Sequence, residues 1–162
     1  MTQKQFSAHP PKLDVIDIKI LRELQNEARL SSAELAERVS LTASPCWRRV
    51  KQLEDAGVIS GYHAKVNAES LGYAVKASVF VKLDRLARPA PDAFEKAVRS
   101  LAEVLSCYRM SGQYDYQLLV VAKDLNAYGR YSMDYINSLP HVGEIYTSFI
   151  LHEIKAEVAP PA

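Results

Sequence analysis

The sequence has few of the residues that define secreted or membrane proteins. Cys46 and Cys107 are the two cysteines among 162 residues, too few for a disulfide framework, and they indicate a reducing compartment. The longest aliphatic run, Leu118–Ala122, is far short of the roughly 20 residues that span a bilayer. The polar N-terminus lacks the apolar core of a signal peptide. We therefore expect a cytoplasmic globular protein with no membrane partner.

Catalytic and metal-binding motifs are missing as well. The four histidines show no metal-ligand spacing with cysteines or paired carboxylates. No glycine-rich phosphate loop, G-x-S-x-G elbow or C-x-x-C pair occurs. The formal net charge is only +1, so the total charge gives no argument for nucleic acid. The sequence predicts no catalytic residue, no metal and no cofactor, and favours a protein that is not an enzyme.

Start signals for two helices follow the polar N-terminus. Asp14 is a good N-cap for a helix that runs to about Asn26, where apolar residues recur at helical spacing. Ser31 and Glu34 have the spacing of a capping box, which predicts a short second helix.

A third helix is predicted from about Ser44 to Ala56. Thr42 or Ser44 is its cap, Pro45 lies in the first turn, and Gly57 ends it. Only a few residues separate it from the second helix, which is the outline of a helix-turn-helix. The following segment, residues 58–67, has β character and is expected to form a small wing or an interdomain strand.

The exposed face of this third helix carries the candidate DNA contacts. Between Thr42 and Leu53 there are three cations and no acid, and arginine and glutamine suit base edges while serine and lysine suit phosphates. A solvated charged face is the alternative interpretation. The candidates are Thr42, Ser44, Trp47, Arg48, Arg49, Lys51 and Gln52.

Three of the helix's residues have a second interpretation. Arg49 lies at the edge of the buried stripe and could pair with a carboxylate of the first helix, such as Glu23, instead of touching DNA. For Trp47, partial burial against a neighbouring helix is favoured over insertion into DNA. Cys46 faces inward, which favours a small buried apolar residue over a redox switch.

The second half has the element order βαββαβ, that of a ferredoxin-like fold of class α+β. Strands are expected at residues 75–83, 104–110, 116–122 and 144–154. One helix carries Phe94, Val98 and Leu101, and another follows Asp124 and stops at Pro140. The turn at residues 111–115, between two strands, favours binding of a small polar ligand; an acid/base site at Asp115 and a plain hairpin turn are the alternatives.

Several motifs resemble the Lrp/AsnC (leucine-responsive, feast/famine) family of transcriptional regulators. They include Leu13-Asp14-x-x-Asp17, Ser44-Pro45-Cys46-Trp47-Arg48-Arg49-Val50 and Ser111-Gly112-Gln113-Tyr114-Asp115-Tyr116. The resemblance extends from residue 13 to about residue 155. It implies a flexible segment (1–12), a winged helix-turn-helix domain (13–62), a linker strand (63–73), a ferredoxin-like ligand-binding and oligomerisation domain (74–155) and a C-terminal tail (156–162).

The resemblance also implies partners. Members bind double-stranded DNA as homodimers that often assemble to octamers, and they commonly sense an amino acid bound between protomers. The matching effector residues are Gly112, Gln113, Tyr114, Asp115, Tyr116, Thr147, Ser148 and Phe149. Two positions depart from the family: Gln113 stands where many members carry Asp, and Trp47 where an aliphatic residue is common.

Two other functions compete with a regulator. A small-molecule-binding or metabolic enzyme domain with a helical N-terminal module would turn over a substrate and ignore DNA. A redox sensor would act through Cys46 and Cys107 and would lose its response without them.

Overall fold

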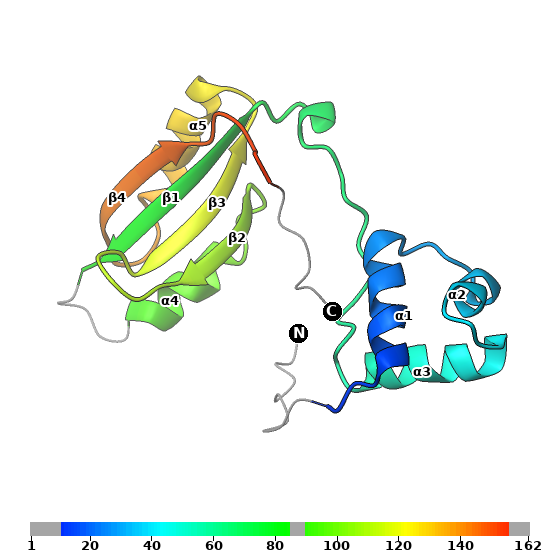
Figure 1. The fold of residues 1–162 in the computed structure, drawn as a ribbon. Helices are drawn as coiled ribbons and strands as arrows, with labels where there is room; N and C mark the ends of the chain where they lie inside the picture. Colours follow the sequence, from blue (N-terminus) through cyan, green and yellow to red (C-terminus); the bar gives the residue numbers. More distant parts are fainter. Residues whose placement is uncertain (1–10, 85–89, 156–162) are drawn as a thin grey trace. The chain divides into compact units, whose positions relative to one another are not determined.

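The computed structural model describes residues 11–84 and 90–155 and is shown in Figure 1. The chain divides into two compact units at Lys65/Val66, close to the expected domain boundary. Most of the expected N-terminal segment and the whole C-terminal tail (156–162) lie outside the described residues.

The first unit consists of three helices, α1 (Val15–Asn26), α2 (Ser32–Arg38) and α3 (Ala43–Asp55). The predicted N-caps of α1 and α2 are confirmed: Asp14 and Ser31 each form a capping box with the residue three positions on. A cluster of buried side chains from all three helices joins them, including Ile20, Leu35 and Cys46. The helical positions that the periodicity placed inside are therefore the ones that make this core.

Helix α3 begins and ends as its local sequence dictates. Thr42, not Ser44, is its N-cap, although its side chain makes no capping hydrogen bond. At the other end Gly57 has φ +73°, a conformation that glycine adopts without a Cβ penalty. The Gly57 amide then donates to the Glu54 carbonyl and the Val58 amide to the Leu53 carbonyl, both at 2.9 Å, which is the Schellman arrangement.

The strands expected in residues 58–67 and in the linker (63–73) are not formed. Residues 58–67 contain no strand, and the linker contains a single 3₁₀ turn, η1 (Glu69–Leu71). A strand needs a neighbour to accept its hydrogen bonds, and no strand is found in the described part of the first unit. The β-type side chains alone do not produce one.

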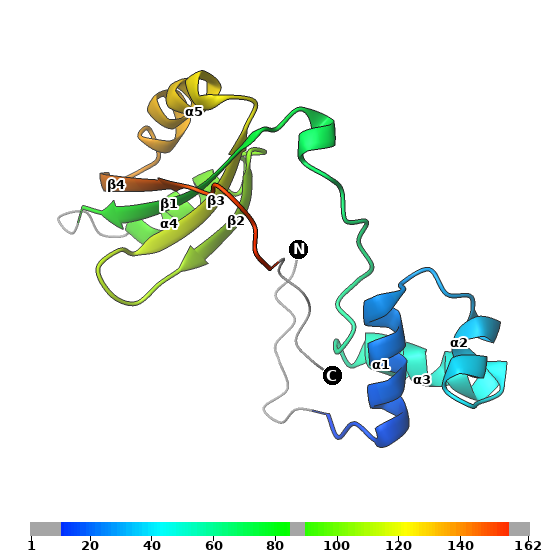
Figure 2. The same cartoon turned by 45° about the horizontal axis from the view of Figure 1, so that its top comes forward.

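The second unit is a four-stranded antiparallel sheet with the predicted ferredoxin-like topology (Figure 2). Its strands, in the spatial order β2-β3-β1-β4, are β1 (Val75–Leu83), β2 (Val104–Arg109), β3 (Tyr116–Ala122) and β4 (Val142–Phe149). The helical segments are α4 (Ala90–Val98), α5 (Leu125–Tyr131) and the π-helical turn η2 (Ser132–Ile136).

The sheet has one covered face and one open face. Val79 and Val81 of β1 are fully buried in a cluster that also contains Phe94 of α4 and Tyr128 of α5, so both helices pack on the same side. Lys76, Ser78, Phe80 and Lys82 alternate with these residues and therefore point to the other side. We call this second side the open face.

Several element ends differ from expectation in this unit. The helix expected to run from Asp124 to Pro140 is divided into α5, which ends at Tyr131, and η2, which ends at Ile136. Strand β2 ends at Arg109 and β4 begins at Val142. Helix α4 ends at Val98, so Leu101 packs against the core from the loop beyond it. Strand β4 ends at Phe149 instead of Ile154. Phe149 is paired with Ala77, and the Ile150 amide donates to the Lys76 carbonyl. β1 begins at Val75, one residue before Lys76, so β4 has no partner strand beyond the residue opposite Val75.

Candidate functional site

The outward face of α3 is exposed as the helical spacing predicts. Ser44, Arg48, Lys51 and Gln52 are all exposed, as is Thr42 at the cap. Cys46 and Leu53 of the same helix are buried. α3 therefore presents a polar, cationic surface on the side away from its core.

The three cations of α3 are in different electrostatic situations. Arg49 Nη1 lies 2.7 Å from Asp14 Oδ2 and 2.7 Å from Asp17 Oδ1, and these hydrogen bonds raise the pKa of its guanidinium. Lys51 Nζ lies 3.2 Å from Asp55 Oδ1. Arg48 forms no ion pair with any residue in the described ranges. Arg48 is thus the α3 cation best able to take an external anion or base.

Arg49 pairs with carboxylates at the start of α1, as its alternative interpretation suggested, but with Asp14 and Asp17 instead of Glu23. Its guanidinium joins α3 to the N-terminus of α1 through Asp14 and Asp17. Glu23, the carboxylate suggested by the sequence, pairs with Arg38 of α2 at 3.2 Å. Arg49 therefore fixes α3 against α1.

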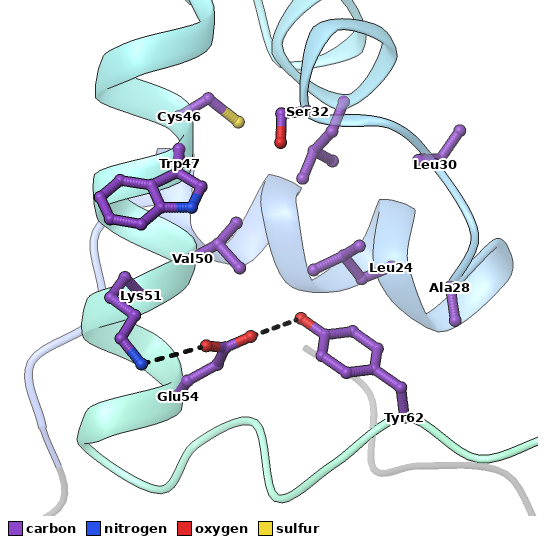
Figure 3. Close-up of a pocket in the computed structure, with 11 residues that line it drawn as sticks. Leu24, Ala28, Leu30, Ser32, Cys46, Trp47, Val50, Lys51, Glu54 and Tyr62 are labelled. Atoms are coloured by element: carbon purple, nitrogen blue, oxygen red, sulfur yellow. Dashed lines mark hydrogen bonds and ion pairs between the residues drawn. The ribbon is translucent and has the colours of Figure 1, made fainter.

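Trp47 borders a pocket of about 260 Å³ in the first unit (Figure 3). Its ring and Val50 extend from α3, and Leu24 of α1 lines the same pocket. Trp47 is 59% exposed, so less than half of its surface is covered by the partial burial expected from the sequence. At the pocket's rim, the Tyr62 hydroxyl donates to Glu54 Oε1 at 3.1 Å, which attaches the segment after α3 to that helix.

The two cysteines are poor redox sensors. Cys46 is fully buried, as predicted, and Cys107 is half-buried. Burial raises the pKa of both thiols, and the nearby Glu95 carboxylate raises that of Cys107 further. Because the thiolate is the reactive form, both thiols react more slowly at neutral pH than an unshifted cysteine does.

The turn at residues 111–115 is built around Asp115. Its Oδ2 accepts a hydrogen bond of 2.8 Å from the Leu83 amide, and its own amide donates to the Val81 carbonyl at 2.9 Å. Its carbonyl accepts from the Met110 amide. Asp115 therefore ties the turn to the end of β1, so part of its hydrogen-bonding capacity is already used within the fold.

The tyrosines on either side of Asp115 lie on opposite faces of the sheet. The Tyr114 ring lies 5.7 Å from Phe80 and 6.2 Å from Tyr146, measured between ring centroids, which places it on the open face. Tyr116 is buried on the covered face, where its ring packs on Phe94 of α4 at 4.5 Å. Gly112 and Gln113 are exposed in the turn itself.

The predicted effector residues of β4 lie away from this turn. The Thr147 and Tyr128 hydroxyls are 2.7 Å apart, and the Phe149 ring meets Tyr128 edge to face; Ser148 is paired with Ser78 on the open side. On β1, Ala77 is paired with Phe149 of β4 and Val81 with Tyr116 of β3. Ala77 and Val81 are four residues apart along this strand. Four residues are roughly 13 Å of strand, so one protomer does not gather all eight residues into a single site.

Some contacts escaped the sequence analysis. It offered a pairing of Arg49 with a first-helix carboxylate but not the partners Asp14 and Asp17, which lie more than 30 positions away in the chain, so no local pattern encodes the choice. The open-face aromatic group of Phe80, Tyr114 and Tyr146 depends on strand pairing. A signal for it existed in the alternation of β1, which places Phe80 opposite the buried valines.

Neither a metal centre nor a membrane span is found in the described residues. Within those ranges no three histidine, cysteine or acidic side chains are grouped closely enough to hold a metal ion. No helix there is both long enough and apolar enough to cross a bilayer.

A cationic helix-turn-helix followed by a ferredoxin-like unit defines a class of DNA-binding regulators, and comparison with known proteins supports this assignment. Residues 13–60 match a family described as winged helix-turn-helix DNA-binding. Residues 76–160 match the Lrp/AsnC ligand-binding domain. The expected wing is therefore part of the matched family, although residues 58–67 form no strand here.

Individual relatives match over nearly the whole chain. The Bkd operon transcriptional regulator of Pseudomonas aeruginosa is 38% identical over 150 residues, covering 93% of this chain and 98% of the relative. The leucine-responsive regulatory protein of Escherichia coli K12 is 40% identical over 146 residues, covering 88% and 87%. A Neisseria meningitidis transcriptional regulator solved in complex with L-methionine is 41% identical, with a TM-score of 0.88 over 92% of this chain and 97% of that one.

The chain belongs to the Lrp/AsnC family of transcriptional regulators. It is a regulator with a helix-turn-helix DNA-binding domain and a C-terminal ligand-binding domain. This family membership, rather than any missing residue, decides against the enzyme interpretation.

Proposed function

We propose that the protein is a cytoplasmic, homo-oligomeric regulator that reads a pseudo-palindromic operator with α3 and responds to an amino acid. The observation that carries the DNA-reading part is the state of Arg48. It is exposed on α3 and has no ion-pair partner in the described ranges, whereas Arg49 and Lys51 are paired with carboxylates.

Arg48 is the main base reader in this proposal, because a free guanidinium can clasp O6 and N7 of guanine. Gln52, Ser44 and Thr42 contribute base or phosphate contacts, and Lys51 exchanges its Asp55 partner for a phosphate. Trp47 borders the same helix face and packs against the DNA backbone. Arg49 acts indirectly by holding α3 in place through its two aspartates.

The open face of the sheet is the proposed dimer interface. Phe80, Tyr114 and Tyr146 form a contiguous aromatic group there, and aromatic residues are enriched in protein interfaces. A dimer with two-fold symmetry reads a pseudo-palindromic site with two copies of α3 in successive major grooves, about 34 Å apart or a multiple of this. Further association of dimers to an octamer is part of the proposal.

The effector site in this proposal is shared between protomers. Within one chain, Thr147 and Phe149 contact Tyr128 on the covered side of the sheet, whereas Tyr114 of the turn lies on the open face, which supports a site built from residues of two copies. An amino acid suits the exposed polar turn, and a relative solved with L-methionine supports this ligand class. Because Gln113 is neutral, we expect it to hydrogen-bond the ligand without pairing with its ammonium group.

Fluorescence anisotropy with labelled DNA from upstream of the protein's own gene tests the DNA-reading part. A shuffled sequence at the same salt concentration is the control, since affinity for DNA depends steeply on salt. Arg48→Ala should weaken operator binding by about 1–3 kcal/mol and binding to the shuffled DNA much less. Arg130→Ala, a matched change at an exposed position of α5, should alter binding to neither DNA. Equal losses on both DNAs would make Arg48 a phosphate contact.

The same assay tests the effector part. Titration with L-methionine, L-leucine and the other amino acids should shift operator affinity for at least one of them. Analytical ultracentrifugation at matched concentrations should show that this ligand changes the distribution between dimers and larger assemblies. A protein that binds its operator identically with and without all twenty amino acids would refute amino-acid sensing while leaving DNA reading intact.

A further inference from the structure

A second pocket lies in the ligand-binding unit, on the covered side of the sheet between α4 and the edge strand β2. Its volume is about 360 Å³, enough for a small metabolite. We call it the α4–β2 pocket. It is lined by Glu95, Val98, Arg99, Val104, Leu105, Ser106, Cys107, Arg109 and Tyr116.

One end of the pocket holds a closed polar network. The Tyr116 hydroxyl donates to Glu95 Oε1 at 2.8 Å and accepts from Arg109 Nε at 3.2 Å. Arg109 Nε also lies 3.4 Å from the same Glu95 oxygen. Glu95 Oε2 is not used by any of these contacts, so this carboxylate retains an oxygen that can accept from a ligand.

The other charged group of the pocket is Arg99, just beyond the end of α4. No hydrogen bond or ion pair links it to any residue of the described ranges. Its positive charge opposes the rise in the pKa of the Cys107 thiol, which means that the guanidinium lies near this side chain. A carboxylate ligand would give Arg99 the charged partner that the protomer does not supply.

Apolar side chains line the pocket between and beside these charges. Val98 of α4 is buried, and Val104 of β2 is half-buried against the core. Leu105, next on the edge strand, is 55% exposed. A ligand with an apolar side chain would cover Leu105 and remove its apolar surface from water, which favours binding.

We propose that the α4–β2 pocket binds a zwitterionic amino acid with an apolar side chain, at a site separate from the turn. The ligand carboxylate pairs with Arg99, its ammonium group donates to Glu95, and its side chain packs on Val104 and Leu105. The ligand class rests on the proposed amino-acid response, but the site does not depend on the turn residues. An anion, an amine and an apolar group match the three kinds of surface in this pocket.

Tyr116 connects the α4–β2 pocket to the turn at residues 111–115. Tyr116 immediately follows Asp115 and ends the polar network at Glu95. A ligand ammonium group that donates to Glu95 Oε2 binds the same carboxylate whose Oε1 accepts from Tyr116 and contacts Arg109. Binding is therefore coupled to the end of the turn that the proposed function assigns to the effector.

Cys107 provides a direct readout, because it lines the pocket while Cys46 is fully buried in the other unit. The full-length protein is alkylated with iodoacetamide at pH 8, and peptide mass spectrometry follows each cysteine separately. L-leucine and L-methionine should slow alkylation of Cys107, by about tenfold at a ligand concentration roughly ten times Kd. The rate at Cys46 should not change.

Ligand analogues and variants give the proposal its controls. Leucinol, which lacks the carboxylate, and N-acetyl-L-leucine, which lacks the ammonium group, should protect Cys107 far less. Arg99→Ala should weaken protection by about 10–100-fold, while Arg130→Ala should leave it unchanged. Both variants should bind operator DNA normally without ligand, because neither residue is part of α3.

Two outcomes would overturn the proposal. In one, none of the amino acids protects Cys107. In the other, protection is the same in Arg99→Ala, which would mean that assembly driven from another site covers the thiol. Failure of the proposed effector response is a separate result: operator affinity would ignore amino acids while Cys107 protection persisted.

Discussion

The contact of Arg49 with α1 predicts that two adjacent arginines of α3 have separable roles. Arg49→Ala removes the guanidinium that joins α3 to Asp14 and Asp17. Asp17 is 16% exposed and Arg49 29% exposed, so the contact is partly shielded from water. Arg48 is exposed and unpaired in the described ranges, and Arg48→Ala therefore provides a matched control.

The expected loss can be worked out from the better buried half of the contact. A hydrogen bond between charged groups contributes roughly 1.5–3 kcal/mol when buried, and an exposed pair contributes at most about 1 kcal/mol. For the intermediate burial of Arg49 and Asp17, the free energy of unfolding of the first unit should fall by about 1–2 kcal/mol. Arg48→Ala should change it by less than about 0.5 kcal/mol.

The assay is urea unfolding followed by tryptophan fluorescence. Trp47 is the single tryptophan of the chain and belongs to the first unit, so its signal reports unfolding of that unit without a contribution from the sheet. Operator selectivity, measured by anisotropy in buffer without urea, should survive in Arg49→Ala and disappear in Arg48→Ala. An Arg49→Ala protein of unchanged stability that has lost selectivity would refute the reasoning and assign Arg49 to DNA.

Three further predictions concern the same contacts and the sheet. The Asp17 amide and the Arg49 side chain lower the pKa of Asp14. The contribution of the Asp14 carboxylate to the stability of the first unit is therefore complete above the ordinary aspartate pKa and is lost as the pH falls below about 4. Acid titration of Trp47 fluorescence should show a shallower loss of stability in Arg49→Ala than in the parent. Phe80→Ala removes one of the three mutually adjacent rings of the open-face aromatic group, and sedimentation should show at least a tenfold weaker dimer; an unchanged dimer would place the interface elsewhere. Asp115→Asn cannot retain the charged acceptor for the Leu83 amide, so thermal unfolding of the second unit should occur several degrees lower, and an unchanged midpoint would free Asp115 for a purely ligand-binding role.

Features fixed by short-range chemistry were predictable from the sequence. The capping residues Asp14 and Ser31 and the alternating burial of β1 follow from neighbours a few positions away. β3 begins and ends at the expected residues for the same reason. The exposed face of α3 followed from helical spacing alone.

Features that depend on a distant partner were not predictable in the same way. β4 cannot reach Ile154 because β1 begins at Val75, only two residues beyond the partner of Phe149, and residues 58–67 form no strand because they have no neighbour to pair with. The choice of Asp14 and Asp17 by Arg49 depends on how α1 crosses α3. Strand alternation would put Tyr114 and Tyr116, two residues apart, on the same face, so their separation depends on the turn that precedes β3 and could not be inferred from the strand pattern.

The sheet order has a consequence for how assemblies of this protein can grow. The linker enters the sheet at β1, an inner strand, while β2 and β4 form the two edges. The chain that leads to the DNA-binding unit is therefore continuous with an inner strand and with neither edge strand. Pairing of neighbouring copies along β2 or β4 leaves the strand that carries the linker in its place between β3 and β4.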